Sequence, residues 1–356
     1  MNKNLNMYLS IFAILLLGVL LWLAQEYVNA YYIRILNLIA VNAILALSLN
    51  LIYGFTGMFS LGHAGFMAIG AYISAILVLS EPAKKAMWIL TEIQWPLSVI
   101  QLPFLVTLVL AGFGAALIGW LVAMPVLRLG GDYLGIATLG FAEIIRILIT
   151  NAPSITNGSL GLKGIPAHTN LWVSYGCLVL TVIFMVRLMR SSTGNIFRSI
   201  RDDEIAAKTM GVNTFKYRVL AFTIGSFFAG VGGALMGNLI TTIDPKMFMV
   251  TLTFQVLMIV VVGGLGSITG SLIGSAIIVF GLEWLRIVEN KFDFSDFFMS
   301  IGFSAETATK YFASNGIPGL RMVIFSALLV LVIILRREGI MGRRELPILS
   351  KDREVA

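Results

Sequence analysis

The sequence predicts an all-α fold: a polytopic transmembrane bundle of about ten helices, with one polar helix outside the membrane. Of the 356 residues, 58% are hydrophobic and only 12% are charged, whereas a soluble domain usually carries about 25% charge. The apolar residues fall in long blocks rather than amphipathic stripes, which leaves too little polar surface to cover a soluble core. Lipid is therefore the expected solvent for most of the chain, which we treat as one membrane domain, 1–356.

Ten segments approach the roughly 20 apolar residues that a membrane-spanning helix needs. They are Tyr8–Ala24, Ile33–Tyr53, Ala64–Leu79, Phe104–Met124, Tyr133–Thr150, Leu171–Met189, Tyr217–Ile240, Val250–Val262, Ile268–Leu285 and Leu320–Leu335. Val250–Val262 is short enough to be a half-span. The first run, with Lys3 before it and Val28-Asn29-Ala30 after it, also resembles a signal peptide, although it is longer than the usual apolar core of one.

The distribution of basic residues predicts the orientation. If the loop after Met189 is cytoplasmic and the spans alternate, the inner segments hold fifteen Lys and Arg and the outer segments hold nine. Seven of the inner residues lie between Arg187 and Arg218, and six lie in the tail 336–356. Cytoplasmic loops carry this excess, so we expect cytoplasmic N and C termini in a bacterial inner membrane. The segment 286–318 would then be periplasmic.

Other classes of protein fit the sequence poorly. The formal charge is +7, but the basic residues flank apolar spans rather than alternate with aromatic residues, which argues against nucleic acid. A lone Cys177 gives no disulfide framework, and His63 and His168 lie too far apart for metal-ligand spacing. No paired acids or nucleophile–base constellation indicates an enzyme.

The longest polar insertion, Ser191–Phe222, reads SSTGNIFRSIRDDEIAAKTMGVNTFKYRVLAF. Asp202, Asp203 and Glu204 favour the positive end of a short helix, and Gly211 can stop that helix. The helix would present a small apolar face, with the small residues Ala206 and Ala207, flanked by charges that begin at Arg201. Such a face suits docking into a groove on a partner, and a solvated juxtamembrane helix is the alternative.

Glu204-Ile205-Ala206-Ala207 followed by Gly211 resembles the EAA-type coupling loop of bacterial ABC importer permeases. The chain is similar to the branched-chain amino acid permeases, in the longer-chain subgroup of the LIV-type importers, with urea-type permeases as close relatives. Three further blocks carry this resemblance: ALSLNLIYGFTGMFSLGHAGFMAIGAYISAIL at Ala46–Leu77, LRLGGDYLGIATLGFAEIIR at Leu127–Arg146, and VGGLGSITGSLIG at Val262–Gly274, which Asp244-Pro245 precedes. Four ordered blocks are far more specific than one short motif.

The resemblance implies an importer that combines a second permease subunit, two cytoplasmic ABC ATPases and a periplasmic substrate-binding protein. It implies a coupling role for Arg201, Asp202, Asp203, Glu204, Ala206, Ala207 and Gly211, within a cytoplasmic coupling loop at 191–216. The sequence contains no Gly-Lys dipeptide and hence no Walker loop. We therefore expect this chain to bind no cofactor, with ATP and Mg used by partner ATPases.

Two alternatives remain open on the sequence alone. Urea or short-chain amides could replace leucine, isoleucine and valine as the substrate, because the polar residues of the spans do not discriminate among them. An ion-coupled secondary transporter is less consistent with the sequence. Such transporters usually have buried carboxylates and inverted repeats, but Glu143 and Glu283 are the only acids within the predicted spans.

Glu143 and Arg146 lie within a span at i, i+3 and so share one helix face. An unpaired charge in the bilayer costs at least about 2.5–3.5 kcal/mol, so we expect the two to pair inside the bundle. We favour a structural ion pair that fixes helix packing. A wall or gate of the translocation route is the functional alternative.

Four glycines and two hydroxyl residues interrupt the apolar pattern in Tyr53–Gly65. Broken helices at membrane depth occur where backbone lines a cavity or packs against protein. His63 could titrate there, but such a histidine more often bonds a backbone carbonyl. Asn42 and Asn50, eight residues apart on nearly one face, could bond across helices or line a polar path.

Thr156-Asn157-Gly158-Ser159-Leu160-Gly161 has the composition of a loop and falls on the predicted outer side. Thr156 and Asn157 are candidates for the mouth of the pathway or for contact with the binding protein. An ordinary connecting turn is the simpler interpretation. Glycines such as Gly230 and Gly233 are predicted to let helix backbones approach closely.

Overall fold

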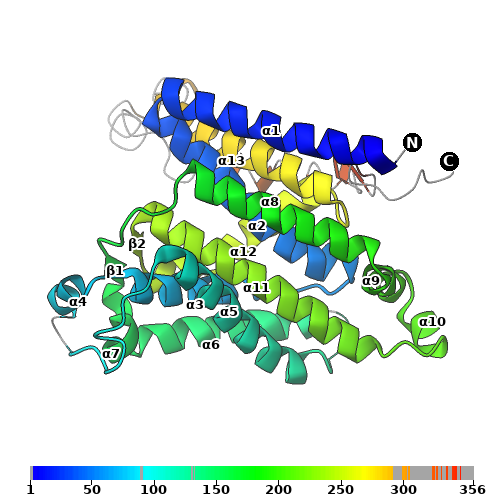
Figure 1. Ribbon diagram of the computed structural model, residues 1–356, viewed down its shortest axis with the longest axis horizontal. Helices are drawn as coiled ribbons and strands as arrows, with labels where there is room; N and C mark the ends of the chain where they lie inside the picture. The colour runs from blue at the N-terminus through cyan, green and yellow to red at the C-terminus, as the bar shows by residue number, and fades with distance from the viewer. Residues whose placement is uncertain are drawn as a thin grey trace.

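Long apolar helices dominate the structure, as the blocks of apolar sequence predict (Figure 1). The computed structural model describes residues 3–88, 91–129, 131 and 133–291, together with 299–302, 304, 323–324, 326–327, 330, 334–335, 339–342 and 345. The helical bundle confirms the predicted fold class. The only strands in the described ranges are β1 (Leu162–Lys163) and β2 (Thr242–Ile243), which pair antiparallel.

The helices follow one another with short connections. They are α1 (Lys3–Tyr27), α2 (Ala30–Asn50) with its π-helical continuation η1 (Leu51–Phe55), α3 (His63–Val78), α4 (Glu81–Met87), α5 (Phe104–Val126), α6 (Tyr133–Thr150), α7 (Pro153–Thr156), η2 (Gly158–Leu160), α8 (Leu171–Arg190), α9 (Ser192–Asp202), α10 (Glu204–Thr209), α11 (Thr214–Ile240), η3 (Pro245–Phe248), α12 (Val250–Gly263) and α13 (Ile268–Lys291).

The predicted count of ten spans is wrong for the described part of the chain. Six helices there are long and apolar enough to cross a membrane, and the pair α3–α4, bent by 117°, would make a seventh. Helix α12 has only 14 residues, about two thirds of the length that a span needs. In α1 the count considers only Leu15–Tyr27, so it covers the predicted span Tyr8–Ala24 only in part. Most of the predicted span Leu320–Leu335 lies outside the described residues.

Helices α2 and α11 form the centre of the bundle. The apolar window of the α2–η1 span is 83% buried and that of α11 is 72% buried, against 22% for α6 at the edge. Helix α2 is apolar on all sides, which is the pattern of a helix surrounded by others. Helix α11 packs against α2, α3 and α5.

Glycines bring α11 close to its neighbours. A Cβ placed on Gly233 would lie 2.1 Å from the Met67 carbonyl oxygen of α3, and one on Gly70 would lie 2.0 Å from that of Gly230. A Cβ on Gly230 would lie 2.5 Å from the Ala115 methyl of α5. These positions admit no side chain, so the predicted packing role of the α11 glycines is confirmed here.

The bundle has two distinct ends (Figure 1). Helices α4 and α7 and the β1–β2 pair gather at one end, while α9, α10 and the start of α1 lie at the other. Late residues of the chain also reach this second end. The Ile340 and Met341 amides donate to the Val262 and Gly263 carbonyls at the end of α12, at 2.8 and 3.1 Å. The segment 286–318 falls largely outside the described residues; the exceptions are the end of α13, up to Lys291, and residues 299–302 and 304.

Candidate functional site

Helix α9 attaches the polar insertion to the bundle. Ser191 caps its N-terminus, and its hydroxyl accepts a hydrogen bond from the Gly194 amide. Phe197 and Ile200, three residues apart, are both buried, and α9 packs against α8, α11 and η1. This spacing places one apolar stripe against the bundle, so α9 is fixed in place at the bundle surface.

Helix α10 follows after a sharp break at Asp203. The Asp203 backbone is extended, with φ −156° and ψ 107°, and its carboxylate accepts from the Ile205 and Ala206 amides at 2.8 and 3.0 Å. This N-cap ends α9 and begins α10. The helix stops before Gly211, whose φ of +83° favours glycine. The polar insertion therefore forms two helices where one was predicted, and Arg201 and Asp202 belong to the first of them.

Glu204 ties α10 to the start of α11. Its carboxylate pairs with Lys208 at 2.9 Å and with Arg218 at 2.6 Å, and it accepts a longer bond from the Thr214 hydroxyl at 3.4 Å. Partial burial opposes ionisation of Glu204. The two cations outweigh that effect and hold the pKa of its carboxyl below the ordinary value. Glu204 therefore stays ionised at neutral pH and holds the base of α10.

The tip of α10 carries apolar side chains that the bundle does not cover. Ile205 is 75% exposed and Met210 is 84% exposed, while Ala207 on the inner side is buried. Charged residues surround them at Asp203 and Lys208. An apolar tip within a charged helix, held out from the end of a bundle (Figure 1), has the form of a docking element.

Arg201 connects α9 to the interior of the bundle. Its Nη1 donates to the Gly54 carbonyl of η1 at 3.2 Å, while Nε and Nη2 hold Asp202 at 3.0 and 2.9 Å. The Arg201 backbone also packs against Gly57, where a Cβ would lie 3.3 Å from the Arg201 Cα. Movement of α9 would thus act directly on the broken segment after α2.

Asn50 forms the next connection inward. Its amide nitrogen donates to the Ser267 carbonyl and the Ser271 hydroxyl, both at 2.8 Å, and its carbonyl oxygen accepts from the Gly266 amide at 2.8 Å. Asn50 is fully buried. It therefore joins α2 to the α12–α13 turn, beside the point where Arg201 meets Gly54.

Asn42 does not take part in this network. Its side-chain amide donates to the Leu38 carbonyl in its own helix at 2.9 Å. Asn37 likewise bonds Ile33 one turn back, and it also accepts from the Ser174 hydroxyl of α8. The predicted cross-helix bond thus forms at Asn50 but not at Asn42, and a further one that was not predicted forms at Asn37. Asn42 and Asn50 share no polar path among the described side chains.

His63 is buried at the start of α3, directly after the predicted break in the helix. Its Nε2 lies 2.8 Å from the Ser48 hydroxyl, which itself bonds the Leu45 carbonyl at 2.7 Å. Because that hydroxyl has one hydrogen, Nε2 is the donor to Ser48 and Nδ1 is left without a partner. The histidine thus bonds a hydroxyl, which in turn donates to the Leu45 backbone carbonyl.

Glu143 and Arg146 pair on α6, as their spacing predicts. Arg146 Nε donates to the two Glu143 oxygens at 3.1 and 2.9 Å, and Nη2 also contacts the carboxylate. The pair is not buried inside the bundle as we expected: the Glu143 side chain is 47% exposed and that of Arg146 is 22% exposed. Helix α6 lies at the edge, and the pair joins residues of one helix rather than two helices.

Thr156 and Asn157 lie at the opposite end from α10 and are buried. The Thr156 hydroxyl bonds the Ile149 and Ala152 carbonyls at 2.5 and 2.8 Å, and the Asn157 amide donates to the Gly161 carbonyl at 2.8 Å. Asn157 has φ +61°, a conformation that asparagine tolerates. Both side chains stabilise a turn, which is the simpler of the two interpretations.

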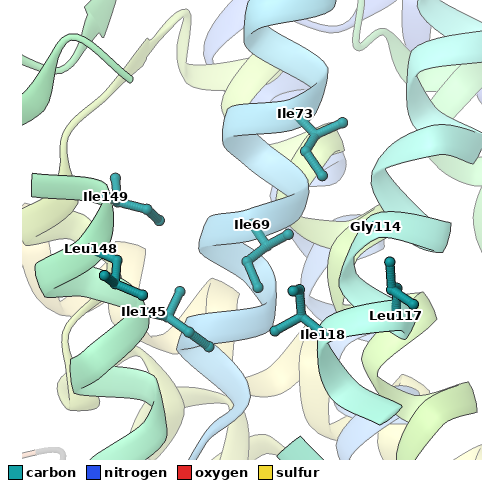
Figure 2. A pocket seen from close by; sticks show the side chains of 8 residues that line it. All are labelled: Ile69, Ile73, Gly114, Leu117, Ile118, Ile145, Leu148 and Ile149. Atoms are coloured by element: carbon teal, nitrogen blue, oxygen red, sulfur yellow. The ribbon is translucent and has the colours of Figure 1, made fainter. Parts of the chain in front are cut away.

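An apolar groove of about 460 Å³ lies between α3, α5 and α6. Figure 2 shows its lining: Ile69, Ile73, Gly114, Leu117, Ile118, Ile145, Leu148 and Ile149. The aliphatic lining offers no side-chain donor or acceptor to a polar solute. Among the residues that the structure describes, no three His, Cys, Asp or Glu side chains gather where they could hold a metal ion.

The predicted site residues therefore form two groups rather than one. Arg201 to Gly211 lie at one end, with Asn50 behind them, whereas Glu143, Arg146, Thr156 and Asn157 lie toward the other. Sequence reasoning missed Gly54, Gly266 and Glu345. The Glu345 carboxylate accepts from the Ile268 and Thr269 amides at 2.5 and 3.0 Å and so caps α13. An acid 77 residues from its helix gives no local signal.

Comparisons with known proteins agree with the resemblance seen in the sequence. Residues 31–333 match the family described as branched-chain amino acid transport system, permease component. The chain is 31% identical to a high-affinity branched-chain amino acid transport system permease protein LivM of Escherichia coli K12 over 301 residues, which cover 75% of this chain and 65% of that protein. The LivM protein of Salmonella typhimurium is 32% identical over 72% of this chain and 62% of its own length.

A second type of relative matches more of its own length. The LivH permease protein of Salmonella typhimurium is 26% identical over 85% of this chain and 92% of that protein. The chain thus spans a little under two thirds of the LivM proteins and most of LivH. No solved structure shows significant similarity. The match to the family over most of the chain, and the bundle of apolar helices, show that this protein is a multi-pass membrane protein of the branched-chain amino acid transport permease family.

Proposed function

We propose that this chain is a permease subunit of an ATP-driven importer that carries leucine, isoleucine and valine into the cytoplasm. Its relatives LivM and LivH are named as permease proteins of high-affinity branched-chain amino acid transport systems. In this proposal the chain pairs with a second permease subunit, and a periplasmic binding protein delivers the substrate. Two cytoplasmic ATPases bind ATP and Mg, and the chain itself performs no hydrolysis.

The observation that carries the proposal is the α9–α10 element. Its tip exposes Ile205 and Met210 for a partner, and its base is fixed through Glu204 to Arg218. Arg201 then connects it to Gly54 in the interrupted helix. A docked ATPase that pushes on this element would shift the α2–η1 segment and the α12–α13 turn together. Such a connection supports a two-state bundle biased by nucleotide.

The orientation follows from the same element. The coupling loop 191–216, the start of α1 and the tail 336–356 belong on the cytoplasmic side in this proposal, and 286–318 belongs on the periplasmic side of the inner membrane. Contacts of Ile340 and Met341 with the end of α12 support it, because the turn after α12 is also where Arg201 of α9 approaches Gly266. The excess of basic residues in these segments agrees.

Reconstitution in proteoliposomes tests the function. We expect ATP-dependent uptake of L-leucine when the chain is combined with its second permease, ATPases and binding protein. Uptake of urea in place of leucine would instead indicate a permease for urea or short-chain amides. Uptake under a proton gradient without the ATPases would instead make it a secondary transporter.

Variants of the coupling element test the mechanism. Gly211→Ala places a Cβ at φ +83°, a strained conformation that costs about 1–2 kcal/mol, so we expect weaker co-purification with the ATPases. Glu204→Gln should do the same. Gly131→Ala is the matched control, since Gly131 also has positive φ and open space around it. Undiminished co-purification of both coupling variants would refute the assignment.

A further inference from the structure

One face of α6 is open along its whole length. Tyr133, Ile136, Gly140, Glu143 and Ile147 follow a three- and four-residue spacing, which places them on one side of the helix. Tyr133 is 73% exposed and Ile136 is 67% exposed. A Cβ on Gly140 would meet nothing within 4 Å. We call this surface the open α6 face.

Lipid does not suit this face, because the Glu143–Arg146 pair belongs to it. The two side chains lie roughly 10 and 6 Å from the Thr150 end of the helix, at a rise of 1.5 Å per residue. Charged side chains at such depth face the interior of an assembly or a water-filled cavity rather than acyl chains. The open α6 face therefore faces another part of the assembly or a water-filled space rather than acyl chains.

The pair leaves bonding capacity unused. Arg146 donates to Glu143 through Nε and Nη2, whereas its Nη1 has no partner within the described ranges. Glu143 Oε2 keeps a lone pair for a further donor, because a carboxylate accepts about four bonds and Arg146 occupies three of them. The guanidinium can thus bind an anionic group and the carboxylate can bind a cationic group, at positions within a few ångströms of each other.

The neighbours of the pair complete a small site. Gly140 lies one turn before Glu143 and leaves a gap beside the carboxylate. Ile136 and Ile144 lie four residues to either side of Gly140 on the helix and are 67% and 49% exposed. A glycine gap bordered by branched aliphatic side chains accommodates a small aliphatic group, while the ion pair holds the charges.

We propose that the Glu143–Arg146 pair, with the Gly140 gap, is the recognition site in the translocation path for a zwitterionic aliphatic amino acid. Arg146 binds the α-carboxylate, Glu143 binds the α-ammonium, and the side chain lies over Gly140 between the isoleucines. This assignment rests on the proposed transport function. It explains why two opposite charges stand three residues apart on an uncovered membrane helix.

Reversal of the pair separates this site from a structural ion pair. The double variant E143R/R146E keeps an ion pair at the same spacing but exchanges the binding positions of the two charged substrate groups. Uptake of radiolabelled L-leucine by the reconstituted complex should fall about tenfold or more, the effect of losing a charge-assisted hydrogen bond. The control is E283R/R286E on α13, an ion pair with the same residue types and spacing at 3.1 Å, and it should retain uptake. Because Glu283 also accepts from the Tyr31 hydroxyl at 2.7 Å, Tyr31→Phe is measured beside it to account for the loss of that bond.

A second variant tests the same site independently, in case the E143R/R146E complex does not assemble. Gly140→Leu fills the gap without any change in charge and should lower uptake by a similar factor. Gly176→Leu on α8, where a Cβ also meets nothing within 4 Å, should not. Undiminished uptake by the reversed pair or by Gly140→Leu, or an equal loss in the control variants, overturns the site. A wild-type complex that imports no amino acid would instead overturn the proposed function.

Discussion

Two asparagines of α2 show how far the surroundings of a residue decide its role. Asn42 and Asn50 are both buried and lie nearly on one helix face. Asn42 bonds only the Leu38 carbonyl of its own helix, whereas Asn50 bonds three groups of the α12–α13 turn. The spacing of the two asparagines predicts polar contacts within the bundle. It does not predict which of the two side chains bonds a neighbouring helix.

Replacement of each asparagine measures that difference. Asn50→Ala leaves the Gly266 amide buried without the Asn50 oxygen that accepts from it, and an unsatisfied buried group costs about 1–3 kcal/mol. We expect the thermal unfolding midpoint of the purified complex to fall clearly. Asn42→Ala, the control, removes one local bond and should lower it much less. Equal midpoints for the two variants would contradict the role of Asn50 in joining α2 to the turn.

Residues at sharp turns were the easiest to predict. Asp203 and Gly211 were expected at the start and end of a helix, and they cap and stop α10. Their signals are local, because a cap depends on the next few amides. The contact from Arg201 to Gly54 spans 147 residues, so no local pattern could have indicated it.

At the scale of elements, the apolar blocks predicted the helices well and the spans less well. Helices α5, α6 and α8 begin at the predicted residues Phe104, Tyr133 and Leu171. The count of spans was too high because it included apolar helices shorter than a membrane crossing, such as the 14-residue α12. The short α12 and the bent α3–α4 pair are both apolar, and protein neighbours rather than lipid cover much of their surface.

The α3–α11 contact offers an element-scale prediction. Gly233→Ala would place a methyl group 2.1 Å from the Met67 carbonyl oxygen, a distance that forces the two helices apart. We expect a strong loss of folded protein in the membrane, measured by fluorescence size-exclusion chromatography. Gly176→Ala on the uncovered side of α8 should be tolerated. A Gly233→Ala chain with a wild-type elution profile would mean that the contact is not as close as described.

The polar α9–α10 element lies at one end of the molecule, and α4, α7 and the β1–β2 pair lie at the other (Figure 1). The sequence indicated the polar end through charge and motif, and the Glu143–Arg146 pair through its spacing, but it predicted a buried pair rather than one on an open helix face. It could not indicate that the two groups lie apart, since that depends on how α2 and α11 arrange the other helices around them. The tertiary network from Arg201 through Asn50 to the α12–α13 turn is likewise a property of the assembled fold.

Orientation is testable on intact cells. In a Cys177→Ser background, which removes the chain's one cysteine, Lys216→Cys at the α10 end should react with a membrane-impermeant maleimide only after permeabilisation. Lys246→Cys, in η3 beside the β1–β2 pair, should react from outside. Both lysines are exposed, so access to the reagent depends on the side of the membrane. The reverse labelling pattern would place α10 outside and exclude ATPase docking there.

The Glu345 cap on α13 has a consequence for biosynthesis. The ribosome adds Glu345 77 residues after the amide that it accepts from, and it adds Gly266 216 residues after Asn50. While the nascent chain enters the bilayer, the C-terminal end of α2 and the N-terminal end of α13 therefore lack partners that have not yet been synthesised. Closure of this end of the bundle is a late step of maturation, which leaves a period in which an insertase or chaperone must shield it.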